Sequence, residues 1–446
     1  AAKYGKALPA GYIEASSTEV AAADVETCAS LRSQDDLRLA LYHAPGDDTR
    51  LRLKLFRFGA PIALSEALPM MENMGLRVLS EHPYEMALTG GARIFIQDFE
   101  VQSQAAGVAV DPAAVREAFQ AAFERTWRGE VESDGFNRLI LSAQMDWRQV
   151  AMLRGYCKYL LQTGVPFSQT YMEEALNRYP RIARQLAELF EARFDQARTD
   201  RGAQMEAAST ALKQMLDSVA SLDDDRILRS FITVIHATLR TNYYQLKHDR
   251  ARDYLCFKFD PAKLPELPKP RPYREIFVYS ARVEGVHLRF GPVARGGLRW
   301  SDRREDFRTE VLGLVKAQMV KNTVIVPVGA KGGFFVKKPP IGGDRDAQLA
   351  EGIACYRIFI NALLDITDNF VEGKLVHPQL VVRHDGDDPY LVVAADKGTA
   401  TFSDIANSIS LEHDFWLGDA FASGGSVGYD HKGMGITAKG GWESVK

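Results

Sequence analysis

The sequence lacks the cysteine spacings that organise metal-bound or disulfide-bonded proteins. Its four cysteines, Cys28, Cys157, Cys256 and Cys355, lie far apart and form no CxxC or CxxH pair. Structural zinc sites and disulfide frameworks need such spacings, so both are poor interpretations. We therefore expect reduced, buried thiols, no metal site and a cytoplasmic protein.

Long apolar runs and an excess of positive charge are also missing. No run of about 18 apolar residues occurs, so the sequence predicts no membrane-spanning helix. The formal net charge is −3 over 446 residues, whereas nucleic-acid-binding domains usually carry a clear basic excess, so we expect no nucleic-acid partner. The chain starts AAKYGK without a signal-peptide pattern and ends GGWESVK. We expect it to be part of a longer protein.

The periodicity of apolar residues indicates a multidomain α+β and α/β chain. Residues 1–36 form an N-terminal helical segment, in which "SSTEVAAADVETCASL" is one capped helix. Residues 37–108 alternate apolar and polar positions around one helical stretch, which predicts a ββαββ module. Such modules often regulate by binding small molecules, although the order of elements alone is weak evidence for that. Residues 109–254 have helical spacing throughout, and residues 255–446 have an α/β pattern.

Five prolines between residues 257 and 275 exclude a regular helix or a central strand there, so we interpret this stretch as a linker. Beyond it the sequence predicts a helix over 304–322 and a buried strand, "TVIVPV". A long helix, "DAQLAEGIACYRIFINALLDITDNF", and the strand "PYLVVAAD" follow.

Gln318 and Lys321 lie near the apolar face of the helix predicted over 304–322. Gln318 follows Val311 by seven residues, and Lys321 comes one turn later. A glutamine and a lysine at the buried edge of a helix end suggest a polar pocket. A lysine that extends to the solvent, with the glutamine at its rim, is the alternative that spacing alone favours.

Lys331 lies in what the sequence predicts to be a glycine-rich turn, with Gly329, Gly332 and Gly333 around it. The glycines allow close backbone approach or unusual dihedral angles. A partly desolvated lysine in such a place can act as an acid or base near neutral pH. A solvated lysine in a surface turn is the alternative. The stretch is not a phosphate loop, because GxxxxGK[ST] is absent.

Two further motifs place charge beside glycines or at a strand end. In "GPVARGGLRW", Arg295 and Arg299 flank a glycine pair and can bind a carboxylate, unless they are solvated in a plain turn. Asp396 ends an apolar strand, which is a common site position in open α/β sheets, although it can also be a helix cap. Together with Gln318, Lys321 and Lys331, these residues suit acid–base chemistry on a small dicarboxylate.

At these residues the chain resembles the amino-acid dehydrogenases, and specifically the glutamate dehydrogenases. Their substrate domain carries a K-G-G-[LI]-R segment, a helix ending Q-x-x-K and a P-x-G-G-A-K-[GA]-G segment around the catalytic lysine. Here these stand as "ARGGLRW", "QMVK" and "PVGAKGG". The wider context, including "HDGDDPYLVVAADKGTATFSDIAN", is similar to the large bacterial NAD-dependent enzymes. The resemblance is strong over 255–446, and over 1–254 it rests on the order of elements.

The resemblance implies a role for each candidate residue. Lys331 matches the lysine that polarises the 2-oxo group and activates water, and Asp396 matches the acid that shuttles a proton to and from the amino group. Lys321 and Gln318 match the contacts to the α-carboxylate. Arg295 stands where the smaller enzymes have a lysine that helps to hold the substrate side chain, and a guanidinium can also bind a carboxylate.

The resemblance implies NAD-dependent oxidative deamination of L-glutamate to 2-oxoglutarate and ammonia by a homo-oligomer. It also implies that 37–108 is an ACT-like module and 255–446 the substrate-binding domain. No GxGxxG follows a strand in the chain, so we expect the NAD site to lie mostly outside it. A dehydrogenase of another amino acid, or a non-catalytic amino-acid sensor, are the alternatives.

Overall fold

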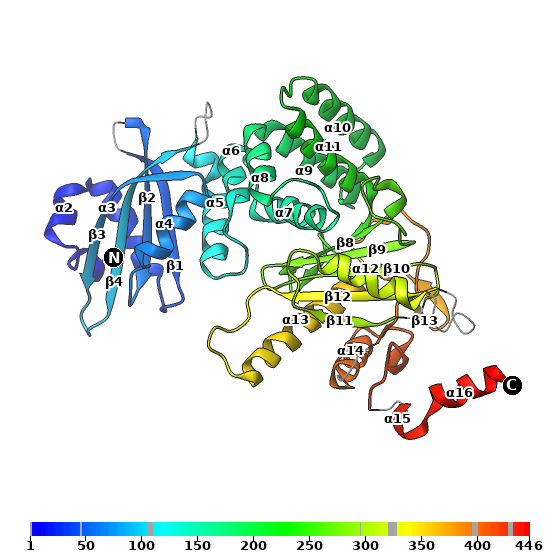
Figure 1. Ribbon diagram of the computed structural model, residues 1–446. Helices are drawn as coiled ribbons and strands as arrows, with labels where there is room; N and C mark the ends of the chain where they lie inside the picture. The colour runs from blue at the N-terminus through cyan, green and yellow to red at the C-terminus, as the bar shows by residue number, and fades with distance from the viewer. Residues whose placement is uncertain are drawn as a thin grey trace. The chain divides into compact units, whose positions relative to one another are not determined.

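The computed structural model describes residues 2–44, 47–104, 110–294, 296–319, 328–394, 400–426 and 431–446. The chain separates into two compact units (Figure 1). Unit 1 comprises Ala1–Arg154 and Thr170–Ala187, and unit 2 comprises Gly155–Gln169 and Glu188–Lys446. Among the described residues, we find no helix with the length and apolar composition needed to cross a membrane.

Unit 1 contains the predicted ββαββ module. Its four strands form one antiparallel sheet in the order β1-β2-β4-β3. The elements are β1 (Leu37–Ala44), β2 (Asp47–Phe58), α4 (Leu64–Asn73), β3 (Leu76–Ala87) and β4 (Arg93–Ser103). The alternation in the sequence therefore predicted these strands correctly, because every second side chain of a strand faces the same side of its sheet.

Helices flank this sheet in the sequence on both sides. The predicted capped helix is α3 (Thr18–Ser30), whose first turn is closed by the Val20 N–H donating to the Ser17 hydroxyl. The other helices that lie wholly or partly in unit 1 are α1 (Ala2–Gly5), α2 (Ala10–Ala15), α5 (Pro112–Trp127), η1 (Gly135–Arg138), α6 (Leu139–Ser142), α7 (Trp147–Gln162), α8 (Gln169–Arg178) and α9 (Pro180–Phe194). In α5, the Asp111 side chain accepts from Ala113 N–H ahead of Pro112, which is a favourable start for a helix.

Unit 2 is built on a six-stranded sheet in the order β11-β12-β10-β9-β8-β5. Its strands are β5 (Thr238–Thr241), β8 (Tyr254–Phe259), β9 (Arg274–Ser280), β10 (Val283–Arg289), β11 (Leu298–Ser301) and β12 (Ala330–Val336). Only the β11–β12 pair within this sheet is parallel. The helical pattern expected over 109–254 thus ends at Ala237, where α11 (Leu222–Ala237) leads directly into β5.

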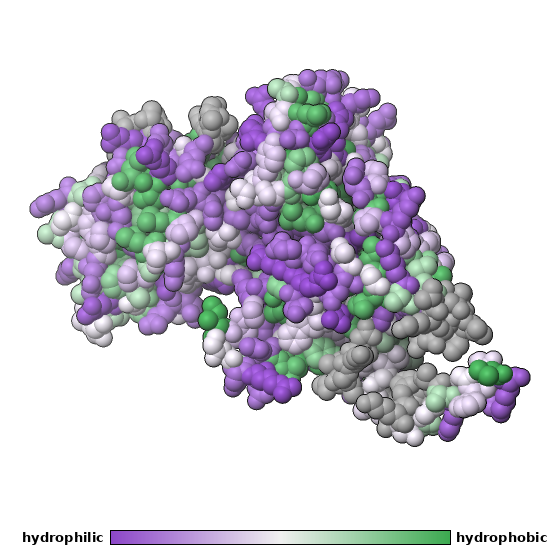
Figure 2. Space-filling model, viewed as in Figure 1, coloured by the Kyte–Doolittle hydropathy of each residue, from purple (hydrophilic) through white to green (hydrophobic). Residues whose placement is uncertain are grey.

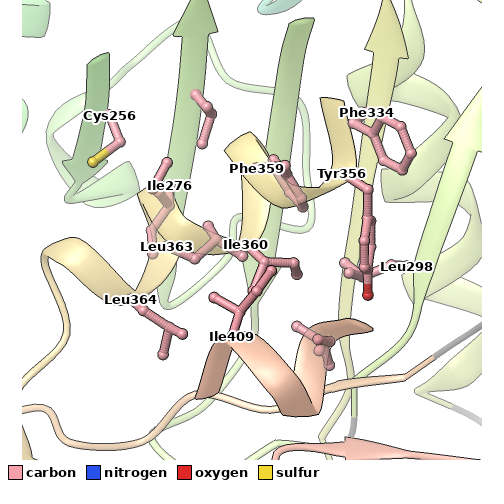
Figure 3. Packing of buried hydrophobic residues seen from close by; sticks show 14 of the residues in the cluster. Cys256, Ile276, Leu298, Phe334, Tyr356, Phe359, Ile360, Leu363, Leu364 and Ile409 are labelled. Atoms are coloured by element: carbon pink, nitrogen blue, oxygen red, sulfur yellow. The ribbon is translucent and has the colours of Figure 1, made fainter. Parts of the chain in front are cut away.

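Helices cover both faces of the six-stranded sheet. On one face α12 (Phe307–Gln318) contacts β10 and β12. On the other face α13 (Arg345–Asp365) and α14 (Ala400–Glu412) enclose an apolar core with the sheet. Figure 3 shows this core, in which side chains of α13 lie between the sheet and Ile409 of α14. This sandwich confirms the α/β class expected for residues 255–446.

The remaining elements of unit 2 are short or lie at its periphery. They are α10 (Arg201–Leu216), β6 (Leu246–Lys247), β7 (Arg250–Ala251), η2 (Pro261–Lys263), β13 (Asn369–Val371), β14 (Lys374–Val376), β15 (Val393–Ala394), η3 (Gly418–Ala420), β16 (Ala422–Ser423), α15 (His431–Met434) and α16 (Ile436–Val445). Figure 2 shows hydrophilic residues over much of the visible face, with hydrophobic ones scattered among them.

Candidate active site

Lys331 lies inside strand β12, so the prediction of a glycine-rich turn is wrong. In the register of the sheet Lys331 pairs with Leu288 of β10 on one side. On the other side the Gly332 N–H donates to the Gly297 carbonyl oxygen at 2.8 Å. The strand is therefore hydrogen-bonded along both edges. The predicted strand "TVIVPV" falls mainly on residues 320–327, which lie outside the described part of the chain.

The glycines of β12 serve close packing and not special dihedral angles. None of Gly329, Gly332 and Gly333 has a φ in the left-handed region. A Cβ on Gly332 would collide with the Leu298 side chain, and one on Gly333 would lie 2.6 Å from a methyl of Val311. The strand can therefore approach β11 and α12 more closely than a strand with side chains could.

The side chain of Lys331 is half-buried and lies over a glycine pair. Residues 329, 331 and 333 share one face of β12, which is the face toward α12. A Cβ at Gly297 would lie 2.4 Å from Lys331 Nζ, so the amine would have to move to make room for a side chain there. Gly296 is restricted in the same way, since its Cβ would lie 2.6 Å from the Val392 carbonyl oxygen. We call Gly296 and Gly297 together the glycine turn. Of the two, Gly297 lies directly beside the amine.

Gln318 lies on the same side of the strand as Lys331. It is the last residue of α12, and its Oε1 lies 2.8 Å from the position that a Cβ of Gly329 would occupy. This Oε1 is buried and accepts no hydrogen bond from the described residues. A buried amide oxygen without a partner is destabilising, so Gln318 Oε1 is a candidate contact for a polar ligand. The sequence had predicted that Gln318 and Lys331 belong to one site.

Three other candidates, Lys321, Arg295 and Asp396, lie outside the described residues. Arg299, the second arginine of its motif, is on β11 and forms an ion pair with Glu310 of α12, with an Nε–Oε1 distance of 2.5 Å. Its side chain is 48% exposed. In the structure, Arg299 therefore binds a carboxylate of the chain itself.

A buried network of charges beside the site was not found in the sequence. Lys258 Nζ donates to Asp385 at 2.6 Å and to Asp388 at 2.8 Å, and Arg289 pairs with Asp388. Arg240 binds Asp385 and Asp368. The run of acidic residues in "HDGDDPY" was the available signal. Its three cationic partners are far away in the sequence, so their pairing could not be read from it.

Ion pairing decides the protonation of this network. Burial acts to raise the pKa of Asp388, but Lys258 and Arg289 outweigh this effect and hold the pKa below its usual value. Burial lowers the pKa of Lys258, and the neighbouring carboxylates oppose that change. His287, on β10 opposite Gly332, is fully buried, and desolvation lowers its pKa to about 3. The imidazole of His287 is therefore neutral near pH 7.

One group of described residues has the spacing of metal ligands. Atoms of Asp368, His377 and Asp387 lie within 4.8 Å of one another. However, Arg383 donates to His377 and Asp387, each at 2.8 Å, and Arg240 binds Asp368. Guanidinium groups thus already hold this group together, and we assign no metal to it.

A cavity of about 470 Å³ lies elsewhere in unit 2. The end of α7, one side of α11 and residues 264–267 line it. Its two arginines, Arg226 and Arg229, pair with aspartates of their own helix. Neither Lys331 nor Gln318 lines this cavity.

The fold and the site define an α/β domain that presents a half-buried amine and a helix-terminal amide to a small polar ligand. An amine and an amide that lie together on one face of a strand are candidates for binding a small polar ligand. Among known families, the profile described as "Bacterial NAD-glutamate dehydrogenase, catalytic domain" matches residues 211–446. The chain belongs to this bacterial NAD-glutamate dehydrogenase family, which confirms the resemblance found in the sequence.

Other regions of the chain match further profiles of glutamate dehydrogenase. The "ACT3 domain" profile matches residues 36–115, "helical motif 3" matches 131–196 and "helical motif 2" matches 1–31. These matches agree with the predicted α+β module and helical segments. The ACT3 match includes the ββαββ module of unit 1.

Similar proteins share sequence over the whole of this chain. An NAD-specific glutamate dehydrogenase of Halomonas elongata is 56% identical over 446 residues, which is 100% of this chain and 28% of that protein. The protein of the same name in Pseudomonas aeruginosa is 55% identical, again over 100% of this chain and 28% of its own length. That of Mycobacterium tuberculosis is 50% identical over 99% of this chain and 28% of its length. The chain thus spans about 28% of the length of these relatives.

Proposed function

We propose that the chain supplies the substrate-binding part of an enzyme that oxidatively deaminates L-glutamate to 2-oxoglutarate and ammonia with NAD. Its membership of the bacterial NAD-glutamate dehydrogenase family and the names of its relatives support this activity. The observation that carries the proposal is the position of Lys331. The amine is half-buried over Gly297, on the face of β12 that also meets Gln318.

We propose that Lys331 polarises the 2-oxo group and activates water. A half-buried amine suits both tasks, because it can donate a proton to a developing oxyanion and accept one from water. Gln318 would contact the α-carboxylate together with Lys321. Arg295 would bind the side-chain carboxylate of glutamate, and Asp396 would exchange a proton with the amino group. An apolar pocket in place of these cations would instead favour leucine or phenylalanine.

We propose that the main site for NAD lies outside this chain. Dinucleotide-binding folds place a glycine fingerprint between a strand and a helix of a parallel sheet. The six-stranded sheet is antiparallel except for the β11–β12 pair. We therefore assign no residue of this chain to NAD, and we place its main site in another part of the enzyme.

We propose four functional parts for the chain: an N-terminal helical segment over 1–36, an ACT-like module over 37–108, a helical region over 109–254 and the substrate-binding domain over 255–446. Strand β5 belongs to the six-stranded sheet, so the last of these parts recruits residues from before 255. We further propose that the enzyme is cytoplasmic and that it works as a homo-oligomer.

Initial rates of the full-length protein that carries this chain test the proposal. We expect the enzyme to reduce NAD when L-glutamate is the substrate. The rate should be much lower when L-leucine replaces glutamate, or when NADP replaces NAD. Preference for leucine would instead indicate a dehydrogenase of another amino acid. Binding of glutamate without any turnover would indicate a non-catalytic sensor. Residues 1–446 expressed alone should produce no NADH from glutamate, and turnover by this piece would show that the cofactor site is misplaced.

A further inference from the structure

We propose that Tyr390, whose backbone carbonyl is bound by Arg289, is a positioning residue that fixes the glycine turn against Lys331. The inference rests on the proposed catalytic role of Lys331. It concerns residues that lie about a hundred positions apart in the sequence and meet beside β12.

The segment around Asp388 is anchored by buried charges. The Asp388 carboxylate accepts from Lys258 Nζ at 2.8 Å and pairs with Arg289. The Asp388 backbone N–H donates to Asp368 Oδ2 at 2.7 Å, and Asp368 is itself bound by Arg240. The side chains of Lys258 and Arg289 are 4% and 6% exposed. Breaking a pair in such surroundings leaves a buried charge without a partner, so the segment is held firmly.

Arg289 connects this anchored segment to the chain that leads to the glycine turn. Its guanidinium donates to the carbonyl of Tyr390, and also to the carbonyl of Pro292 at 3.3 Å. Arg289 ends β10, the strand next to Lys331. One side chain thus joins Asp388, the backbone of Tyr390 and the backbone of Pro292.

Tyr390 makes the second connection. Its hydroxyl donates to the Ala294 carbonyl oxygen at 2.7 Å. Burial raises the pKa of Tyr390, so the hydroxyl remains a protonated donor near neutral pH. Ala294 is buried and lies two residues before Gly296. The hydroxyl therefore holds the backbone just ahead of the glycine turn.

The glycine turn connects the backbone that Tyr390 holds to the surroundings of Lys331. Gly296 packs on the Val392 carbonyl, two residues after Tyr390, and the Gly297 carbonyl accepts from the Gly332 N–H at 2.8 Å. Gly297 lies directly beside Lys331 Nζ. A shift of the turn would change both the space around the amine and its access to water. Tyr390 thus acts through the turn and not on the substrate.

The test is Tyr390→Phe in the full-length enzyme, with Tyr273→Phe as the matched control. Tyr273 is 40% exposed and its ring also faces Arg289. We would measure kcat and KM for glutamate, the melting temperature, and the rate at which formaldehyde and cyanoborohydride methylate Lys331, followed by peptide mass spectrometry. The methylation rate reports on the amine itself and needs no enzymatic turnover.

Loss of one neutral hydrogen bond should lower kcat by about 3- to 10-fold in Tyr390→Phe, with KM nearly unchanged. The methylation rate of Lys331 should rise by at least about twofold, because looser surroundings make the amine more accessible to the reagent. Tyr273→Phe should match the wild type in both measurements. An unchanged methylation rate of Lys331 in Tyr390→Phe would overturn the inference, even if kcat or the melting temperature fell. A wild-type enzyme that is inactive on glutamate would contradict the proposed function, while the methylation rates would still decide this inference.

Discussion

Each unit buries a cluster of charges, and the two clusters differ in what surrounds them. In unit 1, Lys54 is 1% exposed and forms ion pairs with Asp24 and Asp98. The hydroxyl of Tyr12 also donates to Asp24, and the rings of Tyr12 and Tyr42 face the ammonium. In unit 2, the corresponding cluster is that of Lys258, Arg289 and Asp388.

The difference lies in the glycines beside each cluster. None of the glycines described in unit 1 packs against Lys54 or its aspartates. In unit 2, Arg289 also donates to the Tyr390 carbonyl, and the Tyr390 hydroxyl donates to the Ala294 carbonyl oxygen ahead of the glycine turn. The half-buried Lys331 lies over that turn. A buried charge whose partners neutralise it, such as Lys54, therefore belongs to the structural core. We propose that the space which the glycines leave around the partly exposed amine of Lys331 is a site for a ligand.

The largest expected effects concern the two candidates of unit 2 that should fail in different ways. Asp396→Asn should lower kcat by roughly 10²–10⁴-fold with little change in KM, because the amide cannot accept a proton. Lys321→Ala should instead raise KM strongly, because it removes binding energy common to substrate and transition state. Steady-state kinetics of both variants check this. Equal effects on kcat and KM in the two variants would contradict the separate roles.

The next largest effect is expected for variants of the charge cluster in unit 1. Lys54→Ala leaves Asp24 buried without its ammonium partner, which should destabilise the unit by about 3–5 kcal/mol. Chemical denaturation followed by circular dichroism measures this. The matched variant Arg93→Ala removes an ion pair with Glu85 whose partners are 61% and 46% exposed, so its effect should be below about 1 kcal/mol. Similar losses in the two variants would show that the buried cluster is no more important than a surface pair.

A smaller effect is expected for the glycines of unit 2. Gly332→Ala should destabilise by about 1–3 kcal/mol, because its Cβ collides with Leu298. Gly313→Ala, in the exposed middle of α12 with open space around it, should stabilise by up to about 1 kcal/mol. Melting temperatures of the two variants should therefore move in opposite directions. A harmless Gly332→Ala would mean that β12 does not need its glycines for close packing.

The smallest effect is a pH dependence that belongs to unit 2. Desolvation lowers the pKa of His287 to about 3, below its value of about 6.5 in the unfolded chain. The unfolded state therefore binds a proton first, and stability that is present above pH 6.5 is lost as the pH falls toward 3. Between pH 7.5 and 5.5, wild type should lose about 1 kcal/mol more than His287→Gln. Denaturation at both pH values measures this difference, and equal losses would contradict a neutral, buried His287.

Much of the fold was readable from the sequence, because period-two and period-3.6 patterns depend on local residues. The strands β1 to β4 and the helices α3, α5 and α13 were predicted in this way. Strand β12 was not, because Lys331 stands among glycines that normally indicate a turn. The reason for those glycines is the approach of Leu298 and Val311, which are distant in the sequence. A single sequence does not reveal such a contact.

Part of the candidate site could also be predicted from the sequence. Gln318 and Lys331 could be placed together, since a helix end and the next strand are close in the chain. The cluster of Lys258, Arg289 and Asp388 could not, because its members come from two strands and a distant loop. The acidic run alone is as typical of a solvated turn as of a buried network.

The turnover of Lys331→Ala in the full-length enzyme tests the central claim most directly. With glutamate and NAD, kcat should fall by roughly 10²–10⁴-fold, the usual contribution of a general acid–base group. The circular dichroism spectrum and melting temperature should remain those of the wild type. Lys316→Ala, an exposed lysine of α12, should keep wild-type kinetics. Near-normal turnover in Lys331→Ala would contradict the assignment of Lys331 as the catalytic amine.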